Sequence, residues 1–256
     1  MRAAAVAATV DSSEPYVIQN MVLATLAAHD FELLRPHLIP VELKRNAILH
    51  DTNKPVEAVH FIESGVISRV ARTQQDGPVE VAMVGRFGFV GVSVVLGTTG
   101  ALQRTVVQVP GLALRIDAKD LQRIMLESPA IKDHLLRYVQ LLLMLKAQVS
   151  LCNARHEIDK RVARWMLLAR ERIGSDQLPV THDLLASMLG VRRPGVSEAL
   201  ASLESDNVVQ RSRGALHIVD VERLRQKSCE CYKIIYDRFG MLRDMKQHGH
   251  AMTIAD

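Results

Sequence analysis

The chain has 256 residues, of which 48% are hydrophobic and 23% charged, and its formal net charge is +4. This composition indicates a globular protein of one large or two ordinary domains and excludes a largely disordered chain. Aromatic residues make up only 4% of the chain, so a platform that stacks single-stranded bases is not expected. No apolar run approaches the roughly 18 residues of a membrane span, and the N-terminus is a poor secretion signal. Three cysteines give no even disulfide framework, which favours a cytoplasmic protein that does not enter a membrane.

The first half of the chain predicts a flexible tail over 1–15 and a β-roll sensor domain over 16–128. Residues 16–38 have apolar residues near helical spacing. From 41 to 116, short β-rich runs, the fifth of them 89–95, alternate with Gly and Pro turn signals. Many short strands with such turns are typical of an antiparallel sandwich, roll or barrel.

A long helix is predicted over 129–154, because Ser128 and Pro129 form a helix-start signature. Apolar residues recur along it in two interleaved series with seven-residue spacing, which makes a coiled-coil-like seam. The helix either packs on its own domain or associates with a second copy, and we favour self-association. The predicted dimer interface consists of Leu135, Tyr138, Leu142, Leu145, Val149 and Cys152.

Residues 155–225 predict a winged helix-turn-helix, which completes an α+β fold class. Its pattern is a helix over 156–173, a helix over 182–189, a turn at Gly190, a helix over 194–205 and two strands over 208–210 and 216–219. A last helix is expected over 221–239. It enters a C-terminal helical extension, 226–256, whose role the sequence leaves open.

The helix over 194–205 is expected to lie in the major groove with its first residues at the base edges. Arg193 suits a bidentate contact to guanine and Glu198 suits a cytosine amino group, while Thr181 begins a helix whose N–H groups can hold a phosphate. The alternative is an ordinary helical hairpin with solvated arginines. The predicted DNA-binding residues are Thr181, His182, Arg192, Arg193, Gly195, Val196, Ser197, Glu198, Arg211 and Arg213.

Four strings carry a resemblance to a known family: 59-VHFIESGVISRVA-71, 85-GRFGFVGVSVVLG-97, 104-RTVVQV-109 and 180-VTHDLLASMLGVRRPGVSEALASLE-204. With the order of the predicted domains, they resemble the catabolite activator/FNR (Crp/Fnr) superfamily of bacterial transcription regulators. The resemblance implies a cyclic-nucleotide-binding-type β-roll, a homodimer held by the long helices, and a hinge near 153–157. It also implies a palindromic double-stranded operator and RNA polymerase as a further partner.

The effector motifs of the cAMP-binding members are changed in this chain. In those members a Gly-Glu-Leu-like string gives a carboxylate to the ribose and an Arg-Ser pair holds the cyclic phosphate. Phe89 replaces the carboxylate here, so we expect no usual response to cAMP. The alternative is a response to cAMP or another nucleotide through Arg104 and Thr105. The candidate effector-pocket residues are Gly88, Phe89, Val90, Gly91, Arg104, Thr105 and Lys146.

No metal site and no catalytic site are predicted. An FNR-type iron–sulfur cluster needs four thiolates, most of them near the N-terminus, whereas this chain has three cysteines and none before Cys152. Cys229 and Cys231, two residues apart on the expected helix, are expected to point to different sides and to chelate metal poorly. Haem binding stays open. A remote alternative is a cupin-like metal enzyme built on His50 and His60.

Overall fold

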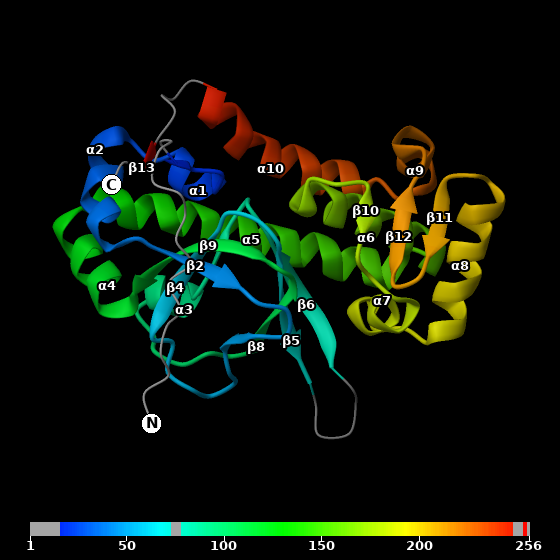
Figure 1. Cartoon of the computed structure of the whole chain (residues 1–256), viewed down its shortest axis with the longest axis horizontal. Coiled ribbons are helices and arrows are strands. Elements are labelled where there is room, and N and C mark those ends of the chain that lie inside the picture. The colour runs from blue at the N-terminus through cyan, green and yellow to red at the C-terminus, as the bar shows by residue number, and fades with distance from the viewer. Residues whose placement is uncertain (1–15, 73–77, 248–252, 255–256) are drawn as a thin grey trace.

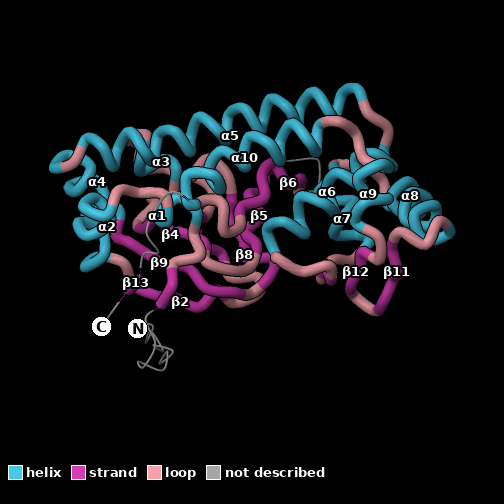
Figure 2. Tube along the Cα trace, turned by 90° about the horizontal axis from the view of Figure 1, so that it is seen from above, coloured by secondary structure: helices cyan, strands magenta, loops and turns pink. Residues whose placement is uncertain are grey.

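The computed structural model describes residues 16–72, 78–247 and 253–254, so the predicted tail over 1–15 lies outside the described residues. A β-rich region and a helical region with a small sheet lie at opposite ends of the molecule (Figure 1). The helix α5 (Pro129–Arg155) runs along one side and connects them (Figure 2). The predicted α+β class, with antiparallel sheets and one long helix, is confirmed.

The β-rich region is a roll of two four-stranded antiparallel sheets, ordered β2-β9-β4-β7 and β3-β8-β5-β6. Buried aliphatic side chains from both sheets, among them Leu43, Ile62, Ile67 and Val107, form a small core between them. The strands are β2 (Ile39–Leu43), β3 (Ile48–His50), β4 (Ala58–Ile62), β5 (Val66–Ala71), β6 (Val79–Val84), β7 (Phe89–Val90), β8 (Arg104–Val109) and β9 (Gly111–Asp117).

The helical spacing over 16–38 does not correspond to one continuous helix, because Asn20 starts a separate short helix inside that range. The buried Asn20 side chain accepts hydrogen bonds from the N–H groups of Val22 and Leu23 and donates to the carbonyls of Ile62 and Gly88. It thus fixes the N-terminal segment to the roll. The elements here are β1 (Tyr16–Val17), α1 (Met21–Ala24), α2 (Ala28–Leu34) and the 3₁₀ helix η1 (Arg35–His37).

The expected strand over 89–95 is also interrupted. Gly91 has φ +103°, a left-handed conformation that favours glycine, and the backbone turns there from β7 into the helix α3 (Val92–Val95). A helix α4 (Ala118–Glu127) follows β9 and packs against α5. Together α2, α3, α4 and α5 cover the end of the roll (Figure 1).

The predicted seam of α5 faces the inside of this chain. Tyr138 packs on Phe89 with ring centroids 4.6 Å apart and lies directly over Gly88. Leu135, Leu142 and Cys152 are also buried, so these side chains already have partners within the chain. The periodicity therefore marks the face of α5 that packs within this chain, on the roll and, at Cys152, on the turn before α10. The structure thus shows the packing alternative for these residues and not the self-association that we favour from the sequence.

The C-terminal region is a helical unit with a three-stranded antiparallel sheet ordered β10-β12-β11. Its helix-turn-helix pair, α7 and α8, packs on α6. The elements are α6 (Ile158–Ile173), β10 (Gln177–Leu178), α7 (His182–Leu189), α8 (Arg193–Ser205), β11 (Val209–Ser212), β12 (Ala215–Ile218) and α9 (Val221–Lys227).

The expected continuous helix over 221–239 is wrong, because the chain leaves helical conformation at Ser228 and a new helix, α10 (Cys231–Gln247), begins after a short turn. α10 returns along the molecule and packs against α1, α5 and α6 (Figure 2). Phe239 of α10 contacts the ring of Phe87 and lies under the guanidinium of Arg172. Beyond it, β13 (Thr253–Ile254) pairs with β1. The extension thus connects the two ends of the molecule.

Candidate nucleic-acid interface and effector pocket

The helix-turn-helix is built by local capping at both ends of α7. The Thr181 hydroxyl accepts a hydrogen bond from the N–H of Leu184 at 3.2 Å and starts the helix. Gly190 ends it with φ +63°, and its N–H bonds back to the last turn. α8 then begins at Arg193 with Pro194 in its first turn. Because the turn between them is short, α8 starts only a few residues after α7 ends and packs against it.

The first turns of α8 present charged side chains to solvent. Arg192, Arg193 and Glu198 are exposed. Arg193 has its Nε 3.2 Å from the carboxylate of Asp183 on α7, an ion pair open to solvent on both sides. The Ser197 hydroxyl lies 3.0 Å from Nδ1 of His182, so the predicted residues on the two helices meet. Burial, followed by the charges of Arg211 and Arg193, lowers the pKa of His182.

Two of the predicted DNA-binding residues are placed in packing positions. Val196 is fully buried in the core between α8 and its neighbours. Gly195 lies against α6, where an added Cβ would come within 2.8 Å of the Ile158 side chain. Both residues set how closely α8 packs on α6 and neither offers a group to a base edge.

The β11–β12 hairpin carries the two remaining arginines. Arg213 lies exposed in the hairpin turn beside Gly214, which has φ +77°. Arg211 forms an ion pair with Glu204 of α8, and this pairing raises the pKa of Arg211 and lowers that of Glu204. The hairpin is therefore held beside α8 with both guanidiniums at the surface.

The predicted effector-pocket residues are not brought together into one cavity. Phe89 is fully buried between Phe61 and Tyr138, and Val90 and Thr105 are also buried. Gly88 lies under the Tyr138 hydroxyl, which an added Cβ would overlap. Lys146 instead donates to the carbonyl of Val81 at 3.3 Å, and burial lowers its pKa.

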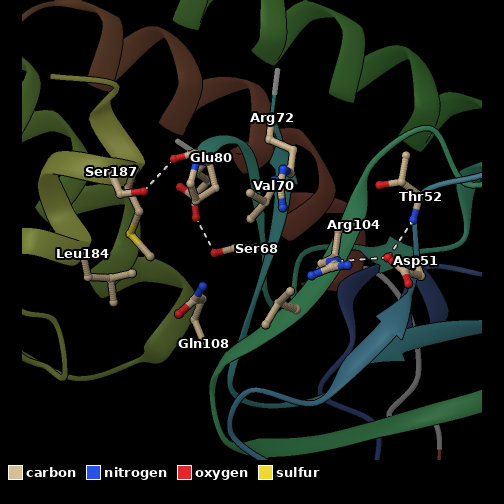
Figure 3. Close-up of a pocket in the computed structure, with 13 residues that line it drawn as sticks. Asp51, Thr52, Ser68, Val70, Arg72, Glu80, Arg104, Gln108, Leu184 and Ser187 are labelled. Atoms are coloured by element: carbon tan, nitrogen blue, oxygen red, sulfur yellow. Dashed lines mark hydrogen bonds and ion pairs between the residues drawn. The ribbon is translucent and has the colours of Figure 1, made fainter. Parts of the chain in front are cut away.

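Of the predicted effector-pocket residues, only Arg104 lines the pocket of about 560 Å³ that lies between the β3-β8-β5-β6 sheet and α7. Figure 3 shows Arg104 beside Asp51, with its Nε 2.9 Å from the Asp51 carboxylate. Apolar side chains of both regions, including Val106, Leu184 and Met188, complete the walls. Residues of the roll and of α7, the first helix of the helix-turn-helix, thus line the same pocket.

Glu80 on β6 lines this pocket and connects the roll to α6. Its carboxylate accepts hydrogen bonds from the Ser68 hydroxyl and, at 3.3 Å, from the indole N–H of Trp165 on α6. Burial raises its pKa to about 7, although the two hydrogen bonds oppose this shift. Ser187 of α7 also donates to the carbonyl of Pro78 at 2.7 Å (Figure 3). Sequence reasoning missed both contacts, because nothing in the local pattern places β6 beside α6 and α7.

The histidines of the enzyme alternative do not form a ligand set. His50 bonds through Nε2 to the carbonyl of Ala58 at 2.9 Å, and its ring centroid lies 5.7 Å from that of His60. Burial lowers the pKa of His60 to about 3. Among the described residues, neither imidazole belongs to a group of potential metal ligands.

One group of potential metal ligands does occur among the described residues. The Cys/His cluster consists of Cys152, His156, Cys229 and Cys231, whose ligand atoms all lie within 4.8 Å of one another. The expectation that Cys229 and Cys231 point apart is wrong, because Cys229 lies in the turn before α10 and not on a helix. A signal was present in the four-residue spacing of Cys152 and His156, which places both on one side of a helix.

Comparisons with known proteins agree with this architecture. Residues 160–227 match the model of the Crp-like helix-turn-helix domain. The structure is similar to the c-di-GMP-responsive global regulator CLP of Xanthomonas campestris, with TM-score 0.62, 16% identity and coverage of 75% of this chain and 99% of that one. It is similar to FixK2 from Bradyrhizobium japonicum, with TM-score 0.66, 13% identity and coverage of 75% and 98%.

A putative cAMP-binding regulatory protein from Silicibacter pomeroyi is also similar, with TM-score 0.60, 20% identity and coverage of 81% of this chain and 97% of that one. No curated protein matches the sequence. The chain therefore carries a Crp-like helix-turn-helix domain and has the fold of the Crp/Fnr transcription regulators.

Proposed function

We propose that this protein is a cytoplasmic, sequence-specific regulator of transcription that binds double-stranded DNA through α8. The observation that carries the proposal is the exposed start of α8, with Arg192, Arg193 and Glu198, inside a domain that matches the Crp-like helix-turn-helix. Arginine is the side chain that reads guanine through two parallel hydrogen bonds, and glutamate accepts from the cytosine amino group. To read a base, Arg193 exchanges its solvent-open ion pair with Asp183 for the guanine edge.

The remaining contacts position the unit on the backbone. Thr181 and the free N–H groups of α7 suit one phosphate, while Arg211 and Arg213 on the hairpin suit the flanking phosphates. His182 on α7 and Ser197 on α8 are hydrogen-bonded to each other, so each would contact DNA as part of that pair. RNA polymerase is proposed as a further partner because the resemblance to the Crp/Fnr superfamily implies it.

The test is selection of genomic DNA fragments by the purified protein, followed by fluorescence anisotropy on the recovered sequence. Arg193→Ala is expected to weaken binding to that sequence and to lose discrimination at one base pair, whereas Lys44→Ala, an exposed change on the roll, leaves both unchanged. A protein that recovers no sequence, or an Arg193→Ala variant that binds it like the parent, contradicts the proposal.

We propose further that the protein acts as a homodimer through the face of α5 that points away from the roll. Leu143 is 63% exposed and Leu151 is 50% exposed, and Met144 is exposed beside them. α5 is long and apolar enough to cross a membrane by length and composition alone, and 33% of its most apolar window is buried within the chain. Because the other side of α5 covers the roll, a second α5 is the partner that suits this stripe. Two copies of α8 then meet a palindromic site.

The effector is proposed to bind between the roll and α7 and not to be cAMP in its usual place. Phe89 fills the position of the expected ribose-binding carboxylate with a buried ring that accepts no hydrogen bond. The pocket is lined by Arg104 and Arg72 and also by Asp51 and Glu80, and it touches α7 directly. An anionic ligand would replace the Asp51 carboxylate as the partner of Arg104. Binding there would bias the position of the helix-turn-helix. The test is the anisotropy of labelled operator DNA with and without millimolar cAMP. DNA binding that ignores cAMP supports this proposal, whereas tighter DNA binding with cAMP supports the alternative, in which Arg104 and Thr105 bind a nucleotide.

A further inference from the structure

The Cys/His cluster lies at the junction of three segments. Cys152 is in the last turn of α5, His156 is the residue that ends α5, and Cys231 begins α10, with Cys229 in the turn before it. All three cysteines are buried and form a small cluster of their own. His156 and Cys231 are 75 residues apart in sequence. The fold, and not local sequence, brings these four side chains together.

The distances within the cluster suit four ligands of a single ion. The sulfurs of Cys152 and Cys229 are 3.5 Å apart, and Nδ1 of His156 lies 3.6 Å from the sulfur of Cys231. Tetrahedral zinc with Zn–S bonds of about 2.3 Å and a Zn–N bond of about 2.0 Å places ligand atoms about 3.5 to 3.8 Å apart. The protein ligands of an iron–sulfur cluster are divided among two or more iron atoms, so a full set of four is spread more widely than the ligands of one ion.

The surroundings supply what a metal–thiolate centre needs. The Gln148 amide donates to the Cys231 sulfur at 3.1 Å, the kind of outer hydrogen bond that orients a ligand. Arg164 of α6 is buried with no hydrogen-bond partner for its Nε within the described residues, and its charge favours the Cys152 thiolate. Arg161 also has a buried, unpartnered Nε and interacts electrostatically with Cys152. Three thiolates and one imidazole around a divalent ion carry one net negative charge, which the positive charge of Arg161 and Arg164 offsets.

We propose that Cys152, His156, Cys229 and Cys231 form a tetrahedral site for one Zn²⁺ ion. The three thiols release their protons on binding, the imidazole binds through Nδ1, and no position is left for water. With all four positions filled by protein the ion is structural, and it fastens the end of α5 to the turn before α10 and to the first residue of α10. The ion closes the loop between His156 and Cys231, which are 75 residues apart in sequence. Closing so long a loop stabilises the fold by restricting the unfolded chain.

Elemental analysis of the full-length protein, purified under reducing conditions, is the first test. We expect about one zinc per chain, with iron and copper far below that, because three thiolates and one imidazole form a closed zinc site. The three thiols are expected to react slowly with Ellman's reagent until a strong chelator removes the zinc, and the melting temperature is expected to fall on removal. Iron together with sulfide, or a disulfide between Cys152 and Cys229 in the fresh protein, overturns the proposal.

The variants assign the ligands. Cys231→Ser is expected to lose zinc in competition with a chelator, while His217→Ala, an exposed histidine on β12, retains about one zinc per chain. Gln148→Ala keeps all four ligands and is expected to weaken zinc binding by about 10- to 100-fold, so the proposal stays testable where Cys231→Ser does not fold. Zinc-free protein is expected to take up Co²⁺ with the visible absorption of a tetrahedral thiolate site. A parent protein that binds neither Zn²⁺ nor Co²⁺ saturably overturns it.

Discussion

The helix-turn-helix and the β-roll use their signature residues in opposite ways. At the start of α8, Arg192, Arg193 and Glu198 project into solvent from a scaffold held by Val196 and Gly195. In the roll, the glycine-bearing string over 88–91 lies inside, with Phe89 buried and Tyr138 covering Gly88. A likeness in glycine pattern therefore reports how strands turn and pack, whereas the exposed polar side chains decide what is bound.

The largest expected effect tests the interior role of the roll motif. Phe89→Ala is expected to lower the free energy of unfolding by about 3 to 5 kcal/mol, because it removes a buried ring and leaves a cavity between Phe61 and Tyr138. Denaturant titration measures this, with Leu102→Ala, a 79% exposed leucine, as the control. A Phe89→Ala protein that is as stable as the control and newly binds cAMP contradicts the claim that the string over 88–91 serves packing and not ligand binding.

The next effect concerns the two faces of α5. Replacing both Leu143 and Leu151 by Glu is expected to weaken self-association by at least about 100-fold, because unpaired charges would be buried in an apolar interface. Analytical ultracentrifugation measures this. Leu126→Glu, on the 83% exposed leucine of α4, is the matched control and is expected to leave association unchanged. If the double variant associates as strongly as the control, the dimer interface does not contain the stripe with Leu143 and Leu151.

The third prediction separates base reading from backbone contact in the DNA-binding unit. Arg193→Ala is expected to cost about 1 to 3 kcal/mol on the selected sequence and to relax specificity at one position. Arg211→Ala is expected to weaken binding to all sequences alike and to reduce the salt slope by about one. Anisotropy at several salt concentrations on matched and substituted DNA decides between them. Equal losses on every sequence for both variants contradict the assignment of Arg193 to a base.

The smallest effect lies where the two regions meet. The pKa of Glu80 is raised from 4.5 to about 7, so the folded state holds a proton that the unfolded chain has released between these values. This contribution to stability is complete below pH 4.5 and is lost as the pH rises toward about 7, by about 1 to 2 kcal/mol since the side chain is partly accessible to water. Glu80→Gln is expected to flatten this pH dependence in denaturant titrations, and an unchanged slope contradicts it.

The fold class and the helix-turn-helix were predictable because their signals are local. Thr181, Gly190 and Pro194 mark the ends of two helices through capping and backbone conformation, which depend on neighbours in sequence. The break at Ser228 and the helix α3 after Gly91 were not predicted, because apolar periodicity continues across both. The repeat also led us to favour the wrong cover for the apolar face of α5, since a seven-residue repeat shows that such a face exists but not what covers it.

The sequence by itself determined the order of the β-rich region, the long helix and the helix-turn-helix, together with the turn of the helix-turn-helix and the charged start of α8. These features rest on residue patterns and on interactions between neighbours in sequence. Only the tertiary structure decided that Phe89 and Tyr138 fill the roll, that Glu80 meets Trp165 across the two regions, and that Cys152, His156, Cys229 and Cys231 converge. Such contacts join residues tens of positions apart. They form because burying the apolar faces of α5, α6 and α10 together fixes where each remaining side chain lies.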